Sequence, residues 1–416
     1  MWGIAWHSLV NRRATAALVV LAIAMSVALI LSVEKLRRDA RASFAGTVSG
    51  TDLVVGARSG SIQLLLYSVF RIGSATNNIS VESVEWVRSR ESIDWVVPLS
   101  LGDSHRGYRV VGTTGDYFER FRHGRDRALA FAEGRPFDDV FDIVLGAEVA
   151  EALGYGLGDR IVVAHGTGSA DLVRHENQPF SVSGILARTG TPVDRSLHVS
   201  LEGIEAMHVD WKGGMPSGEA TPADAIRGMD LEPRQVTALL VGLKSRGAVF
   251  REQRAINRYR EEPLLAVLPG AALQELWSLV GVAETALRAV AGFAVVAGIV
   301  NLVSVLVASL GERRREMAIL RSVGARPARI FGLLCAESAL LGAAGIVAGF
   351  VLHVVAIAAA AGPLVRRFGL ELAPTLPTAT DLSLLAAVFV GAVLAGCLPA
   401  LGAYRRTLAD GMSMRL

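Results

Sequence analysis

Residues 289–310 read AVAGFAVVAGIVNLVSVLVASL, and residues 311–330 continue as GERRREMAILRSVGARPARI. The first run is long enough for the roughly 20 apolar residues that a helix needs to cross a hydrocarbon core. Similar runs occupy 14–33, about 330–362 and about 382–403. Hydrophobic residues make up 51% of the 416 positions but aromatic residues only 6%. The excess is therefore Ala, Val, Leu and Gly, which suit close packing of membrane helices. The sequence predicts a membrane protein with four spans.

The first apolar run resembles a cleavable signal peptide in position but differs from one in length and flanks. Its apolar core exceeds the roughly 7–15 residues of a signal peptide. The stretch that follows, EKLRRDARASFAG at 34–46, begins with charges and not with a small-residue cleavage site. We therefore expect this run to be a retained anchor.

The distribution of basic residues predicts the orientation, because Lys and Arg near span ends favour the cytoplasmic side. Cytoplasmic segments are indicated by these residues: Arg12, Arg13, Arg313, Arg314, Arg315, Arg321, Arg326, Arg329, Arg405, Arg406 and Arg415. Lys35, Arg37, Arg38 and Arg41 lie on the opposite side, but they introduce a long domain, where the rule weakens. We expect a multi-pass inner-membrane protein with both termini in the cytoplasm.

This reading divides the chain into nine segments. The predicted order is a cytoplasmic N-terminus at 1–13, a span at 14–33, a periplasmic domain at 34–285, a span at 286–310, a cytoplasmic loop at 311–329, a span at 330–361, a periplasmic loop at 362–381, a span at 382–403 and a cytoplasmic tail at 404–416.

The periplasmic domain shows the alternating apolar pattern of strands with helical stretches between them. Strands are expected at 51–57, 94–101, 108–114, 141–146, 159–165, 180–187, 236–243 and 264–270, and helices at about 80–90, 147–159 and 248–259. The Gly-, Pro- and Ser-rich stretch 210–233 is expected to be a mobile loop. From Ala271 a helical pattern runs into the second span, which predicts a continuous rod. The fold class is therefore four transmembrane helices with a large α+β domain between helices 1 and 2.

No catalytic or metal-binding motif stands out in this domain. Its histidines are scattered without metal-ligand spacing: His105, His123, His165, His175, His198 and His208. The stretch GARSGS at 56–61 lacks the Gly-Lys-Ser/Thr ending of a phosphate loop. Cys335 and Cys397 lie in apolar runs, so we expect no disulfide framework. The formal charge of +3 does not indicate nucleic acid binding. We expect no catalytic residue and no metal site.

The cytoplasmic loop carries an amphipathic segment with an unusual acidic residue. On a helical wheel one apolar stripe is formed by Ile319, Leu320 and Val323. Glu316 falls inside this stripe, where an unpaired buried carboxylate would be costly. Arg313 could pair with it on a solvated face, or a partner protein could do so. Gly324 is a suitable helix end and Pro327 a suitable start for the next helix. The segment is either a basic clamp on anionic headgroups or a helix that docks into a cytoplasmic partner.

Several polar and small residues lie within the predicted spans. Glu337 is either paired with Arg329 or with backbone, or it takes a direct part in coupling. His353 is expected to face other helices. Interhelical hydrogen bonds are expected from Asn301 and Ser304, and close helix contacts, within the chain or across a dimer, from Ala294, Gly298, Gly345 and Gly349.

The stretch RRREMAILRSVGARPARIFGLLCAESALLGAAGIVAGF at 313–350 resembles the signature of the FtsX-like permease family, the MacB/LolC-type permeases of ABC transporters. Its E-x-A-I-L-R-x-x-G-A motif is matched by Glu316, Ala318, Ile319, Leu320, Arg321, Gly324 and Ala325, with Met317 at the first variable position. Glu337 matches an acidic residue of the third span. The family's Pro-Ala-x-x-Ala-x-Arg ending is matched by Pro399, Ala400, Ala403 and Arg406, although the tail lacks the family's later proline.

This resemblance implies a permease that works by mechanotransmission. A homodimer of the chain would be served by two ATP-binding subunits that hold ATP-Mg, while this chain would bind no cofactor and hydrolyse nothing. Residues 316–321 with Gly324 and Ala325 would be the coupling element. A periplasmic adaptor or lipoprotein and membrane lipid are the other expected partners. The cargo would be hydrophobic, lipid-linked or a peptide. The alternatives are a signalling permease that activates a cell-wall hydrolase and, third, a membrane receptor without an ATPase.

Overall fold

The computed structural model describes residues 12–124, 126–165, 179–212, 215–216, 221–312, 325–368 and 376–412. The chain forms two compact units. The first comprises Met1–Asp39, Gly281–Pro363 and Leu372–Leu416, and the second comprises Ala40–Val280 and Leu364–Glu371. Each unit is described separately below.

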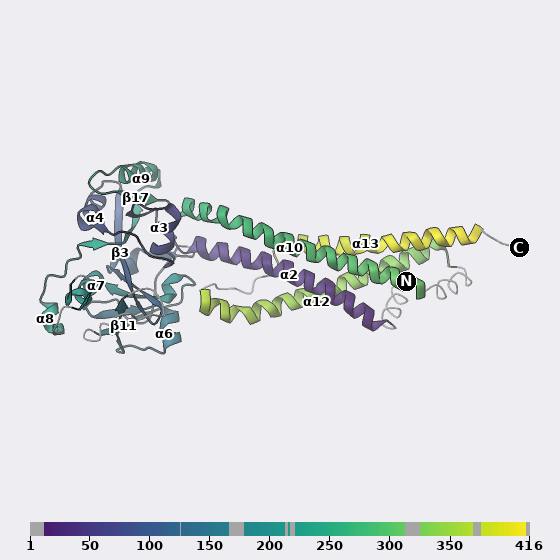
Figure 1. Cartoon of the computed structure of the whole chain (residues 1–416), viewed down its shortest axis with the longest axis horizontal. Helices are drawn as coiled ribbons and strands as arrows, with labels where there is room; N and C mark the ends of the chain where they lie inside the picture. Colours follow the sequence, from purple (N-terminus) through teal and green to yellow (C-terminus); the bar gives the residue numbers. More distant parts are fainter. Residues whose placement is uncertain are drawn as a thin grey trace. The chain divides into compact units, whose positions relative to one another are not determined.

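The first unit is built from four long helices, which Figure 1 shows as extended coils. They are α2 (Arg13–Gly46), α10 (Pro269–Glu312), α12 (Pro327–Phe368) and α13 (Ala379–Met412), of which α2, α10 and α12 also contribute residues to the second unit. Within the described residues, each has a stretch long and apolar enough to cross a membrane. The prediction of four spanning helices is confirmed.

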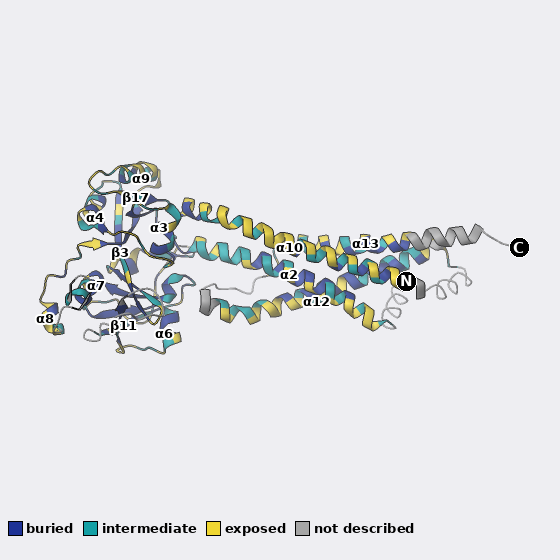
Figure 2. Cartoon of the chain, viewed as in Figure 1, coloured by how far each residue is buried: buried dark blue, intermediate teal, exposed yellow. Residues whose placement is uncertain are grey.

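The four helices share one apolar core. On α2 the buried residues Val19, Ile23, Val27 and Leu31 recur every fourth position, which places them on one face of the helix. They pack with buried residues of the other three helices: Leu302, Leu306, Leu341, Val388 and Ala392. Other apolar residues, such as Leu18 and Met25, are exposed. Figure 2 shows exposed positions in yellow along the long helices. This pattern is expected for a bundle whose outer surface faces lipid.

Small residues allow α2 to lie close to its neighbours, as the sequence indicates. A Cβ atom on Gly345 of α12 would lie 2.6 Å from Cγ2 of Ile23. On Gly349 it would lie 2.7 Å from the carbonyl oxygen of Ala24. On Gly298 of α10 it would lie 3.0 Å from Oγ of Ser26. These three glycines thus make contacts within one chain, so they are not needed to explain packing across a dimer.

The second unit contains a mixed sheet of 11 strands. Its order is β17 (Leu264–Val267), β1 (Leu53–Ala57), β16 (Ala238–Leu243), β3 (Ile93–His105), β4 (Tyr108–Thr113), β12 (Ser196–Ser200), β8 (Asp142–Leu145), β11 (Phe180–Leu186) and β7 (Phe131–Gly134), with β10 (Ala164–His165) on β3 and β9 (Arg160–Ile161) on β11. The β12–β4 and β11–β8 pairs are parallel, whereas the other pairs are antiparallel. Three short pairs complete the strands: β13 (Trp211–Lys212) with β14 (Met215–Pro216), β15 (Gln235–Val236) with β2 (Ile79–Ser80), and β5 (Arg122–His123) with β6 (Arg127–Ala128).

The central strands are apolar on both faces because both faces are covered. Along β1, Val54 packs into one core cluster, while Leu53 and Val55 pack into another. On the first face lie α3 (Ser61–Ser68) and α5 (Asp116–Arg120), and on the second lie α4 (Val81–Arg88) and α9 (Val249–Asn257). Double coverage explains why β1 and β16 read as nearly continuous apolar runs. The predicted α+β class is confirmed.

A third core cluster lies around β8, β11 and β12. It is covered by α6 (Ala147–Leu153), α7 (Leu201–His208) and α8 (Ala223–Arg227). The start of α7 is fixed by Ser200, whose hydroxyl accepts a hydrogen bond from the Gly203 amide at 2.9 Å. Helix α4 is capped in the same way by Ser80. The 3₁₀ turns Pro192–Arg195 and Arg246–Ala248 connect neighbouring elements.

Three predictions for this unit differ from the structure. The strand expected at 159–165 is divided into β9 and β10. The helix expected at 147–159 ends at Leu153, because Gly154 adopts a left-handed conformation with φ of 70° that terminates it. The segment 210–233, expected to be a loop, contains α8, and Ile226 of α8 is fully buried. Strand β12 was not expected, since its sequence SLHVS has polar residues at buried positions.

Candidate functional site

The predicted coupling element lies almost entirely outside the described residues. Glu316, Met317, Ala318, Ile319, Leu320, Arg321 and Gly324 belong to that part of the chain. Ala325 is described, partly buried, and lies two residues before the start of α12. The described part of α10 ends at Glu312, so the element connects α10 to α12. Its docking role stays a prediction.

Glu337 lies inside the helix bundle. Its side chain is 2% exposed, whereas Arg329, one of the partners considered for it, is exposed. The neighbouring residue Ser338 packs tightly against α13, because a Cβ on Gly396 would lie 2.1 Å from the Ser338 hydroxyl oxygen. One turn earlier, the Cys335 and Cys397 sulfur atoms are 3.3 Å apart and both thiols are free. Glu337 is therefore buried, and residues on either side of it in the sequence pack against α13.

The hydrogen bonds expected from α10 differ from those observed. Ser304 is exposed, and its hydroxyl donates to the Val300 carbonyl of its own helix at 2.9 Å. The prediction of an interhelical bond from Ser304 is therefore wrong. Asn301 is partly buried and has no hydrogen bond of its side chain to another described residue. The α2–α10 bond comes from Ser26, whose hydroxyl donates to the Ala294 carbonyl at 2.7 Å.

His353 faces the interior of the bundle, as predicted. Its Nδ1 atom lies 2.9 Å from the Ser32 hydroxyl oxygen of α2. The imidazole is 9% exposed, so this contact satisfies a buried polar group on α12. The observed role is helix packing.

Within the described part of the bundle, contacts between charged side chains join α2 to α13 and α10. Both terminal nitrogens of Arg38 donate to Asp381, at 2.9 and 3.0 Å. The Asp381 carboxylate also accepts from the amide and hydroxyl of Thr378, each at 2.9 Å. On another side of α2, Glu34 pairs with Arg37 and lies 3.5 Å from Arg288 of α10. We call Glu34, Arg37, Arg38, Arg288 and Asp381 the charged layer.

The charged layer was missed at the sequence level, where the basic residues after the first span served only to predict orientation. A usable signal exists: Arg38 follows the first apolar run and Asp381 directly precedes the fourth. Opposite charges at the ends of two spans that share one membrane face are natural partners. The layer contains ion pairs and no nucleophile–base arrangement. Among the described residues, no group of three or more His, Cys, Asp or Glu side chains could hold a metal ion.

A second polar cluster is buried in the sheet unit. His198 of β12 and Tyr117 of α5 are fully buried and stacked, with ring centroids 5.2 Å apart. The Arg71 guanidinium is close enough to interact electrostatically with both Tyr117 and His198. The Tyr117 hydroxyl, Nε of Arg71 and both His198 nitrogens have no hydrogen bond of good geometry within the described structure. Burial, reinforced by repulsion from Arg71, lowers the pKa of His198 to about 3, so the imidazole is neutral at physiological pH.

This shift predicts a pH-dependent stability. Because the folded-state pKa lies below the ordinary 6.5, the unfolded chain binds the proton more readily. The contribution of His198 is complete above pH 6.5 and is lost as the pH falls toward about 3. Between pH 7 and pH 5 the loss amounts to about 2 kcal/mol. Thermal denaturation of the purified full chain should show it as a fall of about 5 °C in Tm.

Two variants isolate this contribution. His198→Leu should lose this part of the Tm difference between pH 7 and pH 5. Tyr117→Phe keeps the imidazole buried and should retain the wild-type difference. An equal acid-induced fall in His198→Leu and the wild type would show that another group is responsible.

With the fold and these sites described, the comparisons with known families can be given. Residues 288–408 match the FtsX-like permease C-terminal family, and residues 14–227 match the MacB-like periplasmic core domain. The second match alone covers half of the chain. The protein therefore belongs to the family of MacB- and LolC-like ABC transporter permeases. Four apolar helices and this membership define a multi-pass protein of a bacterial inner membrane.

Two curated relatives agree with this assignment. The macrolide export ATP-binding/permease protein MacB of Nitrobacter winogradskyi is 24% identical over an alignment of 408 residues that covers 94% of this chain and 56% of the relative. The lipoprotein-releasing system transmembrane protein LolC of Neisseria meningitidis serogroup B is 30% identical over 228 residues, covering 52% of this chain and 48% of the relative. The chain thus spans about half the length of the curated relatives it matches.

Two of the solved structures similar to this chain are a periplasmic region and an extracellular domain. The periplasmic region of MacB from Actinobacillus actinomycetemcomitans aligns with a TM-score of 0.35 and 12% identity, over 55% of this chain and 94% of that one. The extracellular domain of the noncanonic ABC-type transporter YknZ from Gram-positive bacteria aligns with a TM-score of 0.30 and 14% identity, over 52% of this chain and 99% of that one.

Proposed function

We propose that this chain is the membrane subunit that couples ATP hydrolysis, carried out by a cytoplasmic ATP-binding subunit, to conformational work of its periplasmic domain. The chain acts as a homodimer with both termini in the cytoplasm. ATP and Mg²⁺ are held by the partner subunit, and residues 316–321 with Gly324 and Ala325 dock into it.

The observation that carries this proposal is the continuity of α10. This single helix begins at Pro269 among residues of the sheet unit and ends its described length at Glu312, immediately before the predicted coupling element. A helix without an interruption can transmit a displacement along its axis, because its backbone hydrogen bonds resist local bending. The matched FtsX-like region includes both the membrane part of α10 and the coupling element.

The proposed cargo is hydrophobic, lipid-linked or a peptide, moved on the periplasmic side. The MacB-like core domain favours this reading, because its match covers residues 14–227, which include most of the sheet unit. The second candidate is a signalling permease of the FtsX kind. Such a permease uses the same ATP-driven conformational change to activate a cell-wall hydrolase and transports nothing. The match of residues 288–408 to the FtsX-like permease C-terminal family favours it.

Co-purification tests the proposal directly. The full chain, tagged at its C-terminus and purified from its native membrane with vanadate and ATP-Mg to hold the closed complex, should bring down an ATP-binding polypeptide in about equimolar amount. The recovered complex should hydrolyse ATP. The absence of any ATP-binding polypeptide from such preparations would contradict both the transport and the signalling readings. Release of a lipid-linked or peptide cargo, measured against hydrolase activation, then separates the two.

A further inference from the structure

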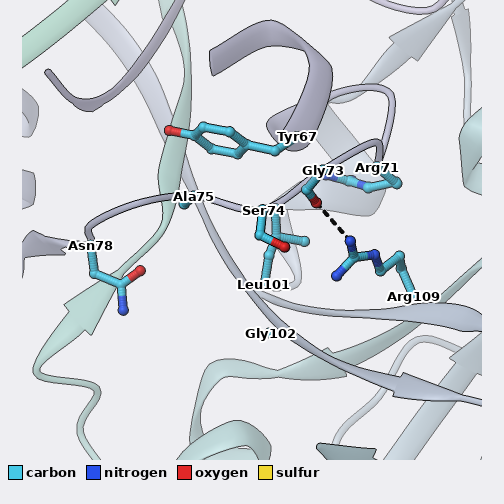
Figure 3. Close-up of a pocket in the computed structure, with 9 residues that line it drawn as sticks. All are labelled: Tyr67, Arg71, Gly73, Ser74, Ala75, Asn78, Leu101, Gly102 and Arg109. Carbon is cyan, nitrogen blue, oxygen red and sulfur yellow. Dashed lines mark hydrogen bonds between the residues drawn. The ribbon is translucent and has the colours of Figure 1, made fainter. Parts of the chain in front are cut away.

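A cavity of about 250 Å³ opens in the sheet unit between the end of α3, the loop that follows it, and strands β3 and β4 (Figure 3). Its lining residues are Tyr67, Arg71, Gly73, Ser74, Ala75, Asn78, Leu101, Gly102 and Arg109. Two of the nine are arginines and none is acidic. A cavity with this lining has a positive potential that is not neutralised by its own walls.

Arg71, in the loop after α3, lines the cavity. Its backbone has a φ of 60°, which a non-glycine residue seldom adopts and which costs about 1 kcal/mol or more. The guanidinium donates from one terminal nitrogen to the Ser68 carbonyl, while its buried Nε has no hydrogen bond of good geometry to a described residue. Burial lowers the pKa of Arg71, which reflects the cost of holding this charge away from water. The backbone therefore holds an incompletely satisfied cation at the cavity.

Arg109 of β4 brings a second cation to the same cavity. One of its terminal nitrogens donates to the Gly73 carbonyl at 2.6 Å, which fixes the side chain toward the loop (Figure 3). Burial and repulsion from Arg71 together lower the pKa of Arg109. Neither arginine has a carboxylate partner among the described residues. Two adjacent, partly desolvated cations repel each other unless an anion lies between or beside them.

The remaining polar lining is suited to an anion as well. Ser74 offers a hydroxyl donor, and Asn78 offers an amide whose oxygen already accepts a hydrogen bond from Thr237 at 3.3 Å. Tyr67 contributes its ring to the lining, with its hydroxyl directed away from the two arginines (Figure 3). The cavity thus combines fixed positive charge with neutral donors, which is the donor set that proteins use for carboxylates and phosphates.

We propose that this cavity is a binding site for an anionic group, a carboxylate or a phosphate, held by Arg71 and Arg109. Its volume lies below that of pockets for drug-sized ligands, about 300–1,000 Å³. The site therefore accommodates a small anion or the acidic end of a larger molecule. The binding is a property of the sheet unit and does not depend on the proposed coupling to an ATP-binding subunit.

Binding is measured on the full chain in detergent, with inorganic phosphate and acetate as soluble probes at constant ionic strength. A saturable rise in Tm with one of these probes, absent with chloride, is the expected result. Arg109→Gln and Arg71→Gln should each weaken binding, so that the half-saturating concentration of the probe rises by about tenfold or more. Arg88→Gln is the matched control, because Arg88 is an exposed arginine of α4 that pairs with Glu85 away from the cavity. It should respond as the wild type does.

A second measurement identifies the source of the anion and protects the test against unstable variants. Native mass spectrometry of the same samples detects phospholipid that stays bound. Retention of phospholipid by the wild type and Arg88→Gln, with loss from Arg109→Gln, would support the anion site with a lipid headgroup as its ligand. Probe-induced stabilisation that is equal in all variants, together with equal lipid retention, would overturn the proposal. The contact of Arg109 with the Gly73 carbonyl is exposed, so Arg109→Gln tests the site even if Arg71→Gln does not fold.

Discussion

Replacing Asp381 with asparagine is expected to lower the Tm of the full chain by about 5–10 °C, corresponding to roughly 2–3 kcal/mol. The substitution keeps the shape of the side chain but removes the charge that both terminal nitrogens of Arg38 contact. The Asp381 side chain is 10% exposed and that of Arg38 is 26% exposed. Removing one partner leaves the other cation poorly solvated, which costs more than the net attraction of the pair.

A double-mutant cycle distinguishes this cause from a general disturbance of the bundle. Arg38→Met combined with Asp381→Asn removes both charges, so it should recover a large part of the stability lost in Asp381→Asn alone. Ser383→Ala is the matched control, since Ser383 is an exposed residue of the same helix whose hydroxyl donates to the Thr380 carbonyl. It should melt within about 1 °C of the wild type. If the two single variants add up in the double variant, the pair is not energetically coupled.

The membrane spans were predicted from the sequence, whereas the charged layer was not. The spans were predictable because lipid demands a local property, a run of about 20 apolar residues, and 14–33 displays it openly. The buried central strands were predictable because their signal is also local, since 53–57 is apolar at successive positions. Arg38 and Asp381 are 343 positions apart, and only the packing of α2 against α13 brings them together.

The arginines of the cavity show the same limit in the sheet unit. Arg71 follows α3 and Arg109 lies on β4, and no spacing rule connects them. The antiparallel register of β3 on β4 and the unusual backbone of Arg71 place both at one cavity. Strand β12 was missed because His198 breaks its apolar pattern, although this imidazole is fully buried. Propensity and periodicity describe neighbours in sequence, whereas these features depend on contacts between distant residues.

Leu320→Asp and Glu316→Lys are each expected to abolish the stimulation of the ATP-binding subunit by this chain, a loss of at least about tenfold. Leu320 belongs to the predicted apolar stripe of the coupling element, and a carboxylate there would have to be buried on docking. Glu316 lies within the same stripe. If the proposed partner supplies a cation to pair with it, Glu316→Lys would place two cations together at the docking site. Reconstituted ATPase activity with and without the permease measures the effect, and protease accessibility of the periplasmic domain checks that insertion is unchanged.

Arg314→Gln provides the control that separates the two interpretations of this element. On the helical wheel Arg314 lies roughly opposite the apolar stripe, so a docking helix should tolerate its loss and retain stimulation. If the element is a clamp on anionic headgroups, Arg314→Gln should instead lose more stimulation than Leu320→Asp or Glu316→Lys. Such a clamp depends on the arginines and on the anionic lipid content of the membrane. Normal stimulation in both Leu320→Asp and Glu316→Lys, with a loss in Arg314→Gln, would therefore contradict docking. Stimulation that follows the apolar stripe and is independent of lipid charge would identify the element as the contact through which ATP hydrolysis acts on α10.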